Sequence, residues 1–526
     1  MIANHDGADI PAGRGRWVLL ATILGSAMAF IDGSAVNVAL PVLQTSLGAN
    51  VSESQWVIDA YLLVLSSLML AGGALGDRFG RVRIFAIGVA FFAAASAWCG
   101  AAPNAAQLIA ARALQGIGAA LLVPGSLAII TAAFPRAQRG RAIGTWSAMT
   151  ALAIIAGPLL GGWLVQAVSW RAVFYINVPI AAATLFAVWL RVPRFPPTLK
   201  GAIDWLGTAL ITLSLGAITF ALIEGPGRGW RDAVVIAAEA VAVVAFVVFF
   251  VVERRARDPI VPLSLFRSRN FTGANVLTLL LYAALSGALF LLPFNLIQVQ
   301  HDSPAKAGAA FMPFVVTMSL LSRFTGALAD RIGARLPLIA GPLVAAAGFA
   351  LMAVPGIGGS YWTTFFPGIA TLGIGMAITV APLTTTVMTS IDDERHAGAA
   401  SGINNTVSRV AGLLAIAIFG AIAVTLFARD LDRRLAFAGD NVRRAMRQQS
   451  LKLAAAAPPR DLDPATRTKV AAAVDAAFVH AFRVDMILAA VIAAASAGGA
   501  LVIKSSRTRR VTMSGRERNV HDTRRK

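Results

Sequence analysis

The chain alternates long apolar runs with short polar segments that are rich in Lys and Arg. Each run has roughly 20 residues, the length that a helix needs to cross a bilayer. We expect fourteen spans, in groups of six, two and six, near residues 17–40, 54–76, 84–101, 107–130, 143–168, 172–190, 202–223, 233–252, 273–299, 307–329, 335–354, 363–389, 398–427 and 482–504. The pattern predicts an all-α polytopic membrane protein with two six-helix bundles and two extra central helices.

The spans divide the chain into consecutive parts. The apolar run that begins at Trp17 continues without a processing site, so it is a first permanent span and not a cleaved signal. The expected parts are a cytoplasmic N-terminus (1–16), a first bundle (17–190), two linker spans with a cytoplasmic linker (191–270), a second bundle (271–504) that contains an extracytoplasmic loop (428–481), and a basic cytoplasmic tail (505–526).

One loop sequence occurs twice. GALGDRFGRVR at residues 73–83 returns as GALADRIGARL at residues 326–336, with six of eleven positions identical. Each copy lies between two apolar runs, so the duplication is one of membrane helices. Eight spans separate the copies, and this even number places both copies on the same side of the membrane.

The repeated loop has the residues of a latch between moving parts. The first glycine of each copy lets a neighbouring helix approach closely, and the last one can end a helix with a left-handed turn. The Asp of each copy can accept hydrogen bonds across a gap between bundles, while the Arg side chains stay among lipid headgroups. A plain solvated turn is the alternative. The predicted gating latch comprises Gly73, Asp77, Arg78, Gly80, Arg81, Gly326, Asp330, Arg331 and Gly333.

Composition agrees with a membrane protein. The chain of 526 residues is 57% hydrophobic and 14% charged, whereas soluble chains carry about 25% charged residues. Of its Lys and Arg residues, 28 lie in the termini and one alternating set of loops, and four lie in the opposite short loops. The positive-inside rule therefore makes both termini cytoplasmic. The net charge of +20 then reflects topology and not a nucleic-acid partner.

The 428–481 loop departs from this charge pattern, because it carries ten Lys and Arg against six Asp. The positive-inside rule has little force for long loops. The 433–453 stretch mixes basic and apolar residues, which favours an amphipathic helix on the outer membrane surface. Solvated disorder is the alternative.

Four polar residues inside the first bundle are candidates for coupling to protons. Asp32 lies near mid-membrane, where inserting a charge costs about 2.5–3.5 kcal/mol, and a carboxylate there suits proton uptake and release. Arg112, with Gln115 one turn later, can hold that carboxylate ionised. Asp59 in the second span is the next candidate. The alternatives are an Asp32 exposed to an outer vestibule, an Arg112 that snorkels to headgroups, and an Asp59 in water.

The fifth span contains the sequence AGPLLGG. Gly157 and Gly161 form a face of small residues, Gly162 follows, and Pro158 permits a bend. A closely packed helix that can bend suits an interface between domains that rock against each other. Ordinary helix packing also explains the pattern.

Several of these stretches resemble motifs of one family. The repeated loop resembles the signature of the major facilitator superfamily between its second and third helices. AFIDGSAVNVALP resembles the first-helix motif of its fourteen-span drug:proton antiporters, with Asp32, Asn37 and Pro41 in place and Ser34 for the usual Thr. RALQGIG resembles the R-x-x-Q-G-x-G motif, and GPLLGG resembles the G-P-x-x-G-G motif that distinguishes antiporters.

The thirteenth span carries a further resemblance. SGINNTVSRVAG is similar to the stretch S-G-x-N-N-T-x-R-Q-x-G-G, with Ser408 and Arg409 in place of the usual Arg-Gln pair. The resemblance makes Asn37, Asn404, Asn405 and Arg409 candidates for the polar lining of a central cavity.

The resemblance implies a major facilitator fold that exports small hydrophobic or amphipathic compounds by alternating access. Such a multidrug efflux antiporter resides in a bacterial inner membrane, uses the proton gradient and no cofactor, and has periplasmic or outer-membrane efflux proteins as further partners. Export of one lipid, siderophore or metabolite, or solute uptake, is the alternative. A membrane-bound enzyme is remote, because the spans offer no HExxH-type metal site, Walker loop, or paired His and carboxylate.

Overall fold

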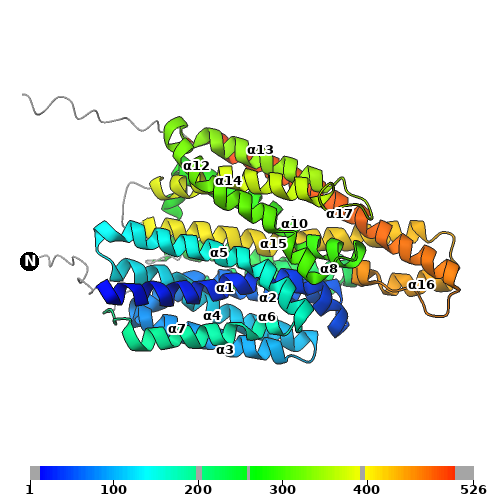
Figure 1. Ribbon diagram of the computed structural model, residues 1–526, viewed down its shortest axis with the longest axis horizontal. Coiled ribbons are helices and arrows are strands. Elements are labelled where there is room, and N and C mark those ends of the chain that lie inside the picture. Colours follow the sequence, from blue (N-terminus) through cyan, green and yellow to red (C-terminus); the bar gives the residue numbers. More distant parts are fainter. Residues whose placement is uncertain (1–11, 197–203, 257–260, 391–396, 504–526) are drawn as a thin grey trace, which may run out of the picture.

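The computed structural model describes residues 12–196, 204–256, 261–390 and 397–503, so the expected 505–526 tail and most of the 1–16 segment lie outside the described residues. The described chain consists mainly of helices that run along the long axis of the molecule (Figure 1). Among the described residues, fourteen helical spans are long and apolar enough to cross a membrane, and each overlaps one of the expected spans. The predicted all-α polytopic fold is therefore confirmed.

The first bundle is the lower layer of Figure 1. Its helices are α1 (Ala12–Leu47), α2 (Val51–Phe79), α3 (Arg81–Ala101), α4 (Ala105–Ala133), α5 (Arg136–Ala167), α6 (Ala172–Tyr175) and α7 (Asn177–Arg191). The sequence fixes the start of α2 with a capping box, in which Asn50 and Glu53 each accept the other's backbone N–H at 2.8 Å. Helix α2 ends at Gly80, whose φ of +102° favours glycine.

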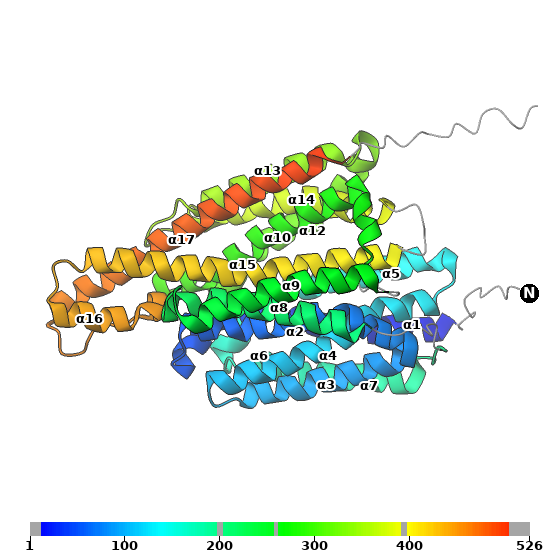
Figure 2. The ribbon, with the colours of Figure 1, turned by 180° about the vertical axis from the view of Figure 1, so that it is seen from behind.

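The two central spans are α8 (Trp205–Arg228) and α9 (Ala233–Arg255), which pack on each other along the back of the molecule (Figure 2). Helix α8 also packs on α2 and α15, and so touches both bundles. Helix α9 leaves a broad apolar surface exposed, including Val243, Val244 and Val247. Such a surface suits lipid contact.

The second bundle is the upper layer of Figure 1. It follows a 3-10 helix (Leu263–Arg267) and contains α10 (Arg269–Phe294), a π-helix (Asn295–Val299), α11 (Pro304–Ala309), α12 (Met312–Ile332), α13 (Arg335–Met352), α14 (Phe365–Thr389), α15 (Ala397–Arg434), α16 (Asp440–Gln448), a second 3-10 helix (Ser450–Ala455) and α17 (Pro464–Leu501). Helix α1 begins and α17 ends at the same end of the molecule (Figures 1 and 2).

The segment expected as the 428–481 loop is largely helical. Helix α15 continues to Arg434, and α17 begins at Pro464, so the span expected at 482–504 is only the second half of a longer helix. Pro464 at the first helical position and the Asp463 cap start α17 early, and Ala-rich sequence then propagates it. Helix α16 lies within the 433–453 stretch that was expected to be helical, and projects beyond the bundles (Figure 1).

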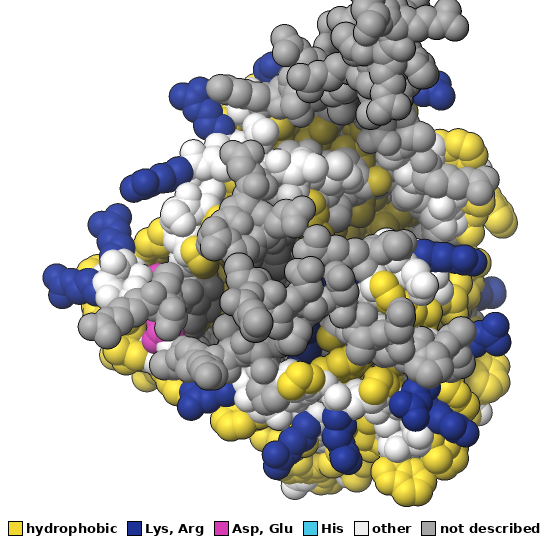
Figure 3. All heavy atoms as spheres, turned by 90° about the vertical axis from the view of Figure 1, so that its left-hand side faces the viewer, with side chains coloured by type: hydrophobic (Ala, Val, Ile, Leu, Met, Phe, Trp, Pro, Cys, Tyr) yellow, Lys and Arg dark blue, Asp and Glu magenta, His cyan; other side chains and the backbone are white. Residues whose placement is uncertain are grey.

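The two ends of the molecule differ in charge and in packing. Exposed Arg78, Arg83, Arg141, Arg191 and Arg331 lie at or near helix ends on the side where α1 begins, which we name the basic end. Figure 3 looks onto this end and shows blue side chains around its rim and a hollow between its upper and lower parts. The opposite end, named the α16 end, holds hydrogen bonds between the bundles, such as the one from Gln298 Nε2 to Gln44 Oε1 at 2.9 Å.

Candidate functional site: a buried charge network in the first bundle

Asp32 and Arg112 form an ion pair inside the first bundle. The Arg112 Nη1 donates to Asp32 Oδ2 at 2.5 Å, from the first third of α4 to the middle of α1. The two side chains are 0% and 1% exposed, so the pair is sealed from solvent. The structure therefore brings together the two charged residues that the sequence proposed as partners, and excludes a snorkelling Arg112.

Amide side chains complete the shell around the Asp32 carboxylate. Gln115 Nε2 donates to Asp32 Oδ1 at 2.9 Å, and Asn177 Nδ2 donates to the same oxygen at 3.0 Å. Both amides also contact the Ser96 hydroxyl, which itself donates to the Phe174 carbonyl oxygen. Every group that contacts the carboxylate here is a donor, which is the arrangement that an ionised Asp32 requires.

The remaining contacts of Arg112 fix its orientation. Its Nε donates to the Val57 carbonyl oxygen at 2.9 Å, and its Nη1 also donates to Gln115 Oε1 at 2.6 Å. The guanidinium carbon lies 4.3 Å from the centre of the Tyr61 ring, a cation–π contact. Four helices thus hold the pair. Helix α1 supplies the carboxylate and α4 the guanidinium, and α2 and α7 supply the groups that contact them.

Sequence reasoning missed Asn177 and Ser96. Asn177 lies in the INVP stretch near the start of the expected sixth span, and it was not among the predicted site residues. In the structure it is the first residue of α7 and is fully buried. Because a buried polar side chain needs hydrogen-bond partners, a lone Asn or Ser in an apolar run was the available signal.

Asp59 does not join this network. Its side chain is 0% exposed, and within the described part of the chain neither carboxylate oxygen has a hydrogen-bond partner. It lies on the α2 face that meets α8, because Ser52 and Trp56 on that face contact Ile223 and Glu224. The alternative of an Asp59 in open water is excluded by its burial, and its coupling role stays a prediction.

The first copy of the expected latch makes contacts within its own bundle. Arg81 Nε donates to Asp77 Oδ1 at 2.6 Å, and Arg81 Nη1 donates to the Ala128 carbonyl oxygen of α4 at 3.2 Å. The Arg78 guanidinium lies over the Phe79 ring. These contacts tie the end of α2 to α3 and α4, and the latch role stays a prediction.

The second copy is only partly described. The Asp330 side chain lies outside the described residues, while Arg331 is exposed at the end of α12. Gly333 ends that helix with a φ of +88°, as Gly80 ends α2 in the first copy. Both glycines have the positive φ expected of them.

The close helix approach expected at Gly73 and Gly326 occurs elsewhere. A Cβ on Gly73 or Gly326 would meet its nearest neighbour at 3.7 or 3.6 Å, an ordinary contact. A Cβ on the adjacent Gly72 would lie 2.1 Å from the Ala120 carbonyl oxygen, so Gly72 permits the contact of α2 with α4. The rotation of α2 about its axis decides which of the two glycines faces the neighbour.

The fifth-span motif packs on two sides. A Cβ on Gly157 would lie 1.8 Å from Ser34 Oγ, and one on Gly161 would lie 2.8 Å from the Ala35 carbonyl oxygen, so these glycines hold α5 against α1. On its other side, the motif meets the second bundle. A Cβ on Gly162 would lie 2.3 Å from the Pro304 carbonyl oxygen of α11. The neighbouring Gly308 approaches Pro158 in the same way.

The four cavity candidates differ in the contacts that they make. Asn404 Nδ2 donates to Asn275 Oδ1 at 3.1 Å and to Thr278 Oγ1 at 2.8 Å, so it joins α15 to α10 and faces away from the first bundle. Asn37 and Asn405 each donate to a backbone carbonyl one turn earlier in their own helix. Arg409 reaches α1, where its guanidinium carbon lies 5.7 Å from the centre of the Phe30 ring.

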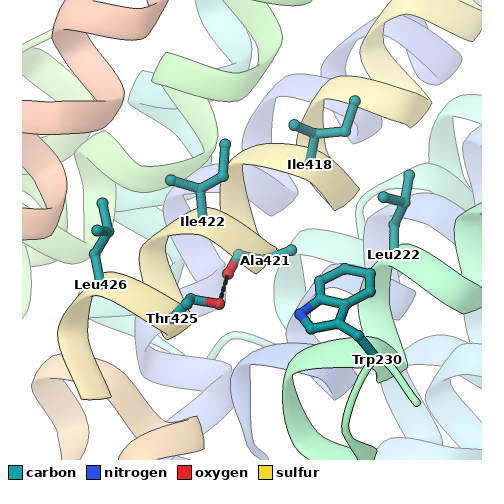
Figure 4. A pocket seen from close by; sticks show the side chains of 7 residues that line it. All are labelled: Leu222, Trp230, Ile418, Ala421, Ile422, Thr425 and Leu426. Atoms are coloured by element: carbon teal, nitrogen blue, oxygen red, sulfur yellow. Dashed lines mark hydrogen bonds between the residues drawn. The ribbon is translucent and has the colours of Figure 1, made fainter. Parts of the chain in front are cut away.

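An apolar groove of about 300 Å³ lies outside the bundles, between α8 and α15 (Figure 4). Its lining is apolar apart from the Trp230 indole N–H and Thr425, whose hydroxyl donates to the Ala421 carbonyl oxygen at 2.8 Å. A groove with so few free polar groups offers little to orient a polar ligand. Over the described residues, no group of three His, Cys, Asp or Glu side chains is placed to hold a metal ion.

Comparisons with known proteins identify the family to which this chain is similar. The sequence model of the Major Facilitator Superfamily matches residues 22–416. The chain is 34% identical over 418 residues to "Multidrug resistance protein Stp" of Mycobacterium tuberculosis (strain CDC 1551 / Oshkosh), covering 79% of this chain and 77% of the relative. It is 35% identical over 407 residues to "Methylenomycin A resistance protein" of Bacillus subtilis (strain 168), covering 77% and 87%.

A solved structure has a similar fold. It is a bacterial homolog of the human lysosomal transporter Spinster in an inward-facing and occupied conformation. The TM-score is 0.68 at 17% identity, covering 94% of this chain and 97% of that one. At this identity the likeness concerns the fold alone.

Proposed function

Because the chain belongs to the Major Facilitator Superfamily, we propose that it is a multi-pass transporter that exports small hydrophobic or amphipathic compounds in exchange for protons. Two of its relatives are named for multidrug resistance and for resistance to methylenomycin A, which supports export. The observation that carries proton coupling is the sealed Asp32–Arg112 pair. No cofactor is needed, because the proton gradient supplies the driving force.

The pair offers a simple coupling step. Protonation of Asp32 removes the negative charge that Arg112 and the two amides bind, and so releases the contacts that join α1 to α4 and α7. Loss of the proton restores them. Such a two-state element lets proton occupancy bias the equilibrium between the two conformations of the transporter.

We place the transport pathway between the bundles, with the basic end in the cytoplasm of a bacterium whose inner membrane holds the protein. At the α16 end, α5 packs on α11 through Gly162 and Gly308. Towards the basic end, α12 and α14 diverge from α5 (Figure 1). This arrangement is the one expected of a transporter open to the cytoplasm. Contact of the α16 end with periplasmic or outer-membrane efflux proteins stays a prediction.

Transport in inverted membrane vesicles tests the proposal. An imposed pH gradient, acidic inside the vesicle, is expected to drive accumulation of a panel of dyes and antibiotics, and an uncoupler is expected to abolish it. Accumulation that is equal with and without the gradient would remove proton coupling but leave transport. Absence of accumulation for the whole panel would overturn export.

A further inference from the structure

Arg409 is a cation that reaches into the space between the bundles. It lies twelve residues after the start of α15, roughly 18 Å along the helix axis and therefore near mid-membrane. Its guanidinium carbon is 5.7 Å from the centre of the Phe30 ring in α1, which belongs to the other bundle. The Arg409 side chain is half-buried.

Among the residues that the structure describes, this guanidinium has no anionic partner. In the described part of the chain, Arg409 makes no ion pair and no hydrogen bond, whereas the fully buried Arg112 has a carboxylate, an amide and a carbonyl. A guanidinium carries five N–H donors and stays charged at any working pH. A charge held at this depth needs a partner, and a mobile molecule is the partner that the fold leaves room for.

Open space lies beside the Arg409 contact. A Cβ added to Gly33 would meet no atom within 4 Å. Phe30, Gly33 and Asn37 share one face of α1, and Asn405 lies one turn before Arg409 on α15 with its side chain exposed. The Phe30 ring and the Arg409 guanidinium border this space, and Asn37 and Asn405 lie on the same helix faces as these two residues.

The carboxylates buried in the described spans do not open onto this space. The carboxylates of Asp32, Asp59 and Asp485 are each 0% exposed. Glu239 belongs to α9, which packs on α8 outside the bundles. Among the described residues of the spans, Arg409 thus sets the sign of the potential in the gap, and that sign is positive.

We propose that the gap between the bundles binds compounds with an anionic group, such as a carboxylate or phenolate, on an aromatic or apolar body. Arg409 binds the anion, for which its planar fork of donors is suited. Phe30 packs against the apolar body, and the Asn37 and Asn405 amides face its polar substituents. This inference rests on the proposed function, because it assigns a substrate class to the same transport pathway.

Two dyes on one xanthene scaffold test it: fluorescein, an anion at pH 7.5, and rhodamine 123, a cation. Binding to the purified full-length protein is measured by fluorescence anisotropy, and uptake is measured in inverted vesicles. The wild type is expected to bind fluorescein more tightly. Arg409→Gln is expected to weaken fluorescein binding about tenfold or more and to leave rhodamine 123 binding unchanged or tighter. Arg409→Lys, which keeps the charge, is expected to retain part of the affinity.

Arg228→Gln is the matched control, because it removes one positive charge at the far end of α8, where Arg228 pairs with Glu224. It is expected to leave both affinities unchanged. Equal loss of both dyes in Arg409→Gln, or unchanged fluorescein binding, would overturn the inference. Gradient-driven uptake of rhodamine 123 without uptake of fluorescein would overturn the proposed preference for anionic compounds. The same result would still support export. Failure to accumulate any compound would count against export itself, and the binding measurement would still decide the role of Arg409.

Discussion

The two six-helix bundles carry copies of one loop, yet they hold buried charge in opposite ways. In the first bundle, Asp32 and Arg112 pair at 2.5 Å, and amides cover the remaining carboxylate oxygen. In the second bundle, Asp485 is 0% exposed and, over the described residues, neither of its oxygens has a hydrogen-bond partner. Arg409 faces the gap between the bundles without an ion pair in the described chain.

The sealed Asp32–Arg112 pair and the gap-facing Arg409 are suited to two different roles. In the proposed function, a pair sealed within one bundle keeps its partners while the bundles move against each other, and protonation is the event that changes the pair. A cation that faces the gap meets whatever enters the gap. The first bundle is thus suited to respond to protons and the second to respond to cargo. The duplicated helices have diverged in charge while keeping the same loop.

Removing the acid of the pair has the largest expected effect. Asp32→Asn imitates the protonated form permanently, so gradient-driven accumulation in inverted vesicles is expected to fall below about a tenth of wild type. Substrate binding is expected to persist, because Asp32 is sealed away from the gap. Arg112→Lys keeps the charge but loses the planar geometry that contacts Asp32, Gln115 and Val57, and is expected to impair coupling.

Glu239→Gln is the control for Asp32→Asn, because it neutralises a carboxylate on α9, away from the pair. It is expected to transport normally. Full gradient-driven accumulation by Asp32→Asn would move the proton site elsewhere, and Asp59 is the next residue to change.

A bulky side chain at Gly157 is expected to have the second largest effect. A Cβ there would lie 1.8 Å from Ser34 Oγ, so Gly157→Leu forces α5 away from α1. Overpacking of this kind costs about 1–3 kcal/mol, and transport is expected to fall more than ligand binding. Gly144→Leu, in the same helix, is the control, because a Cβ at Gly144 meets nothing within 4 Å. Equal transport by the two variants would make α5 an ordinary packed helix.

Much of the fold follows from the sequence because the bilayer fixes span length. All fourteen spans were predicted, because an apolar run of about 20 residues typically forms a helix that spans the membrane. The Asp32–Arg112 contact was also predictable, because opposite charges inside one bundle need each other. The length of α17 was missed, because its polar first half reads as a loop unless the Asp463 cap is noticed.

Features that depend on helix rotation were not predictable. The sequence does not distinguish Gly72 from Gly73 as the residue that faces α4, since one residue rotates the face by about 100°. For the same reason Asn404 and Asn405 looked equivalent, although Asn404 contacts α10 and Asn405 is exposed. The contact of Gly162 with α11 depends on how the bundles meet, which no local pattern encodes.

Removing the latch carboxylate is expected to have a moderate effect. The Asp77–Arg81 pair is partly exposed, so its loss in Asp77→Ala is expected to cost only about 0–1 kcal/mol of stability. Transport is expected to fall severalfold, because the end of α2 is no longer tied through Arg81 to α3 and α4. Arg83→Ala, at an exposed position two residues beyond Arg81, is the control. Normal efflux by well-expressed Asp77→Ala would leave the loop as a simple solvated turn.

The smallest expected effect concerns Asp485, the buried acid of the second bundle. Its carboxyl group is enclosed by α17 and its neighbours with no hydrogen-bond partner in the described chain, and an unpaired buried polar group costs about 1–3 kcal/mol. Asp485→Ala removes that group and places the best helix former in an Ala-rich helix, so we expect a stability gain of about 1–2 kcal/mol by thermal unfolding of the purified protein. Asp430→Ala, which breaks the contact with Arg434, is expected to be neutral or destabilising. A lower unfolding temperature for Asp485→Ala would mean that this carboxyl group has a stabilising partner, and the contrast between the two bundles would then be weaker than the geometry indicates.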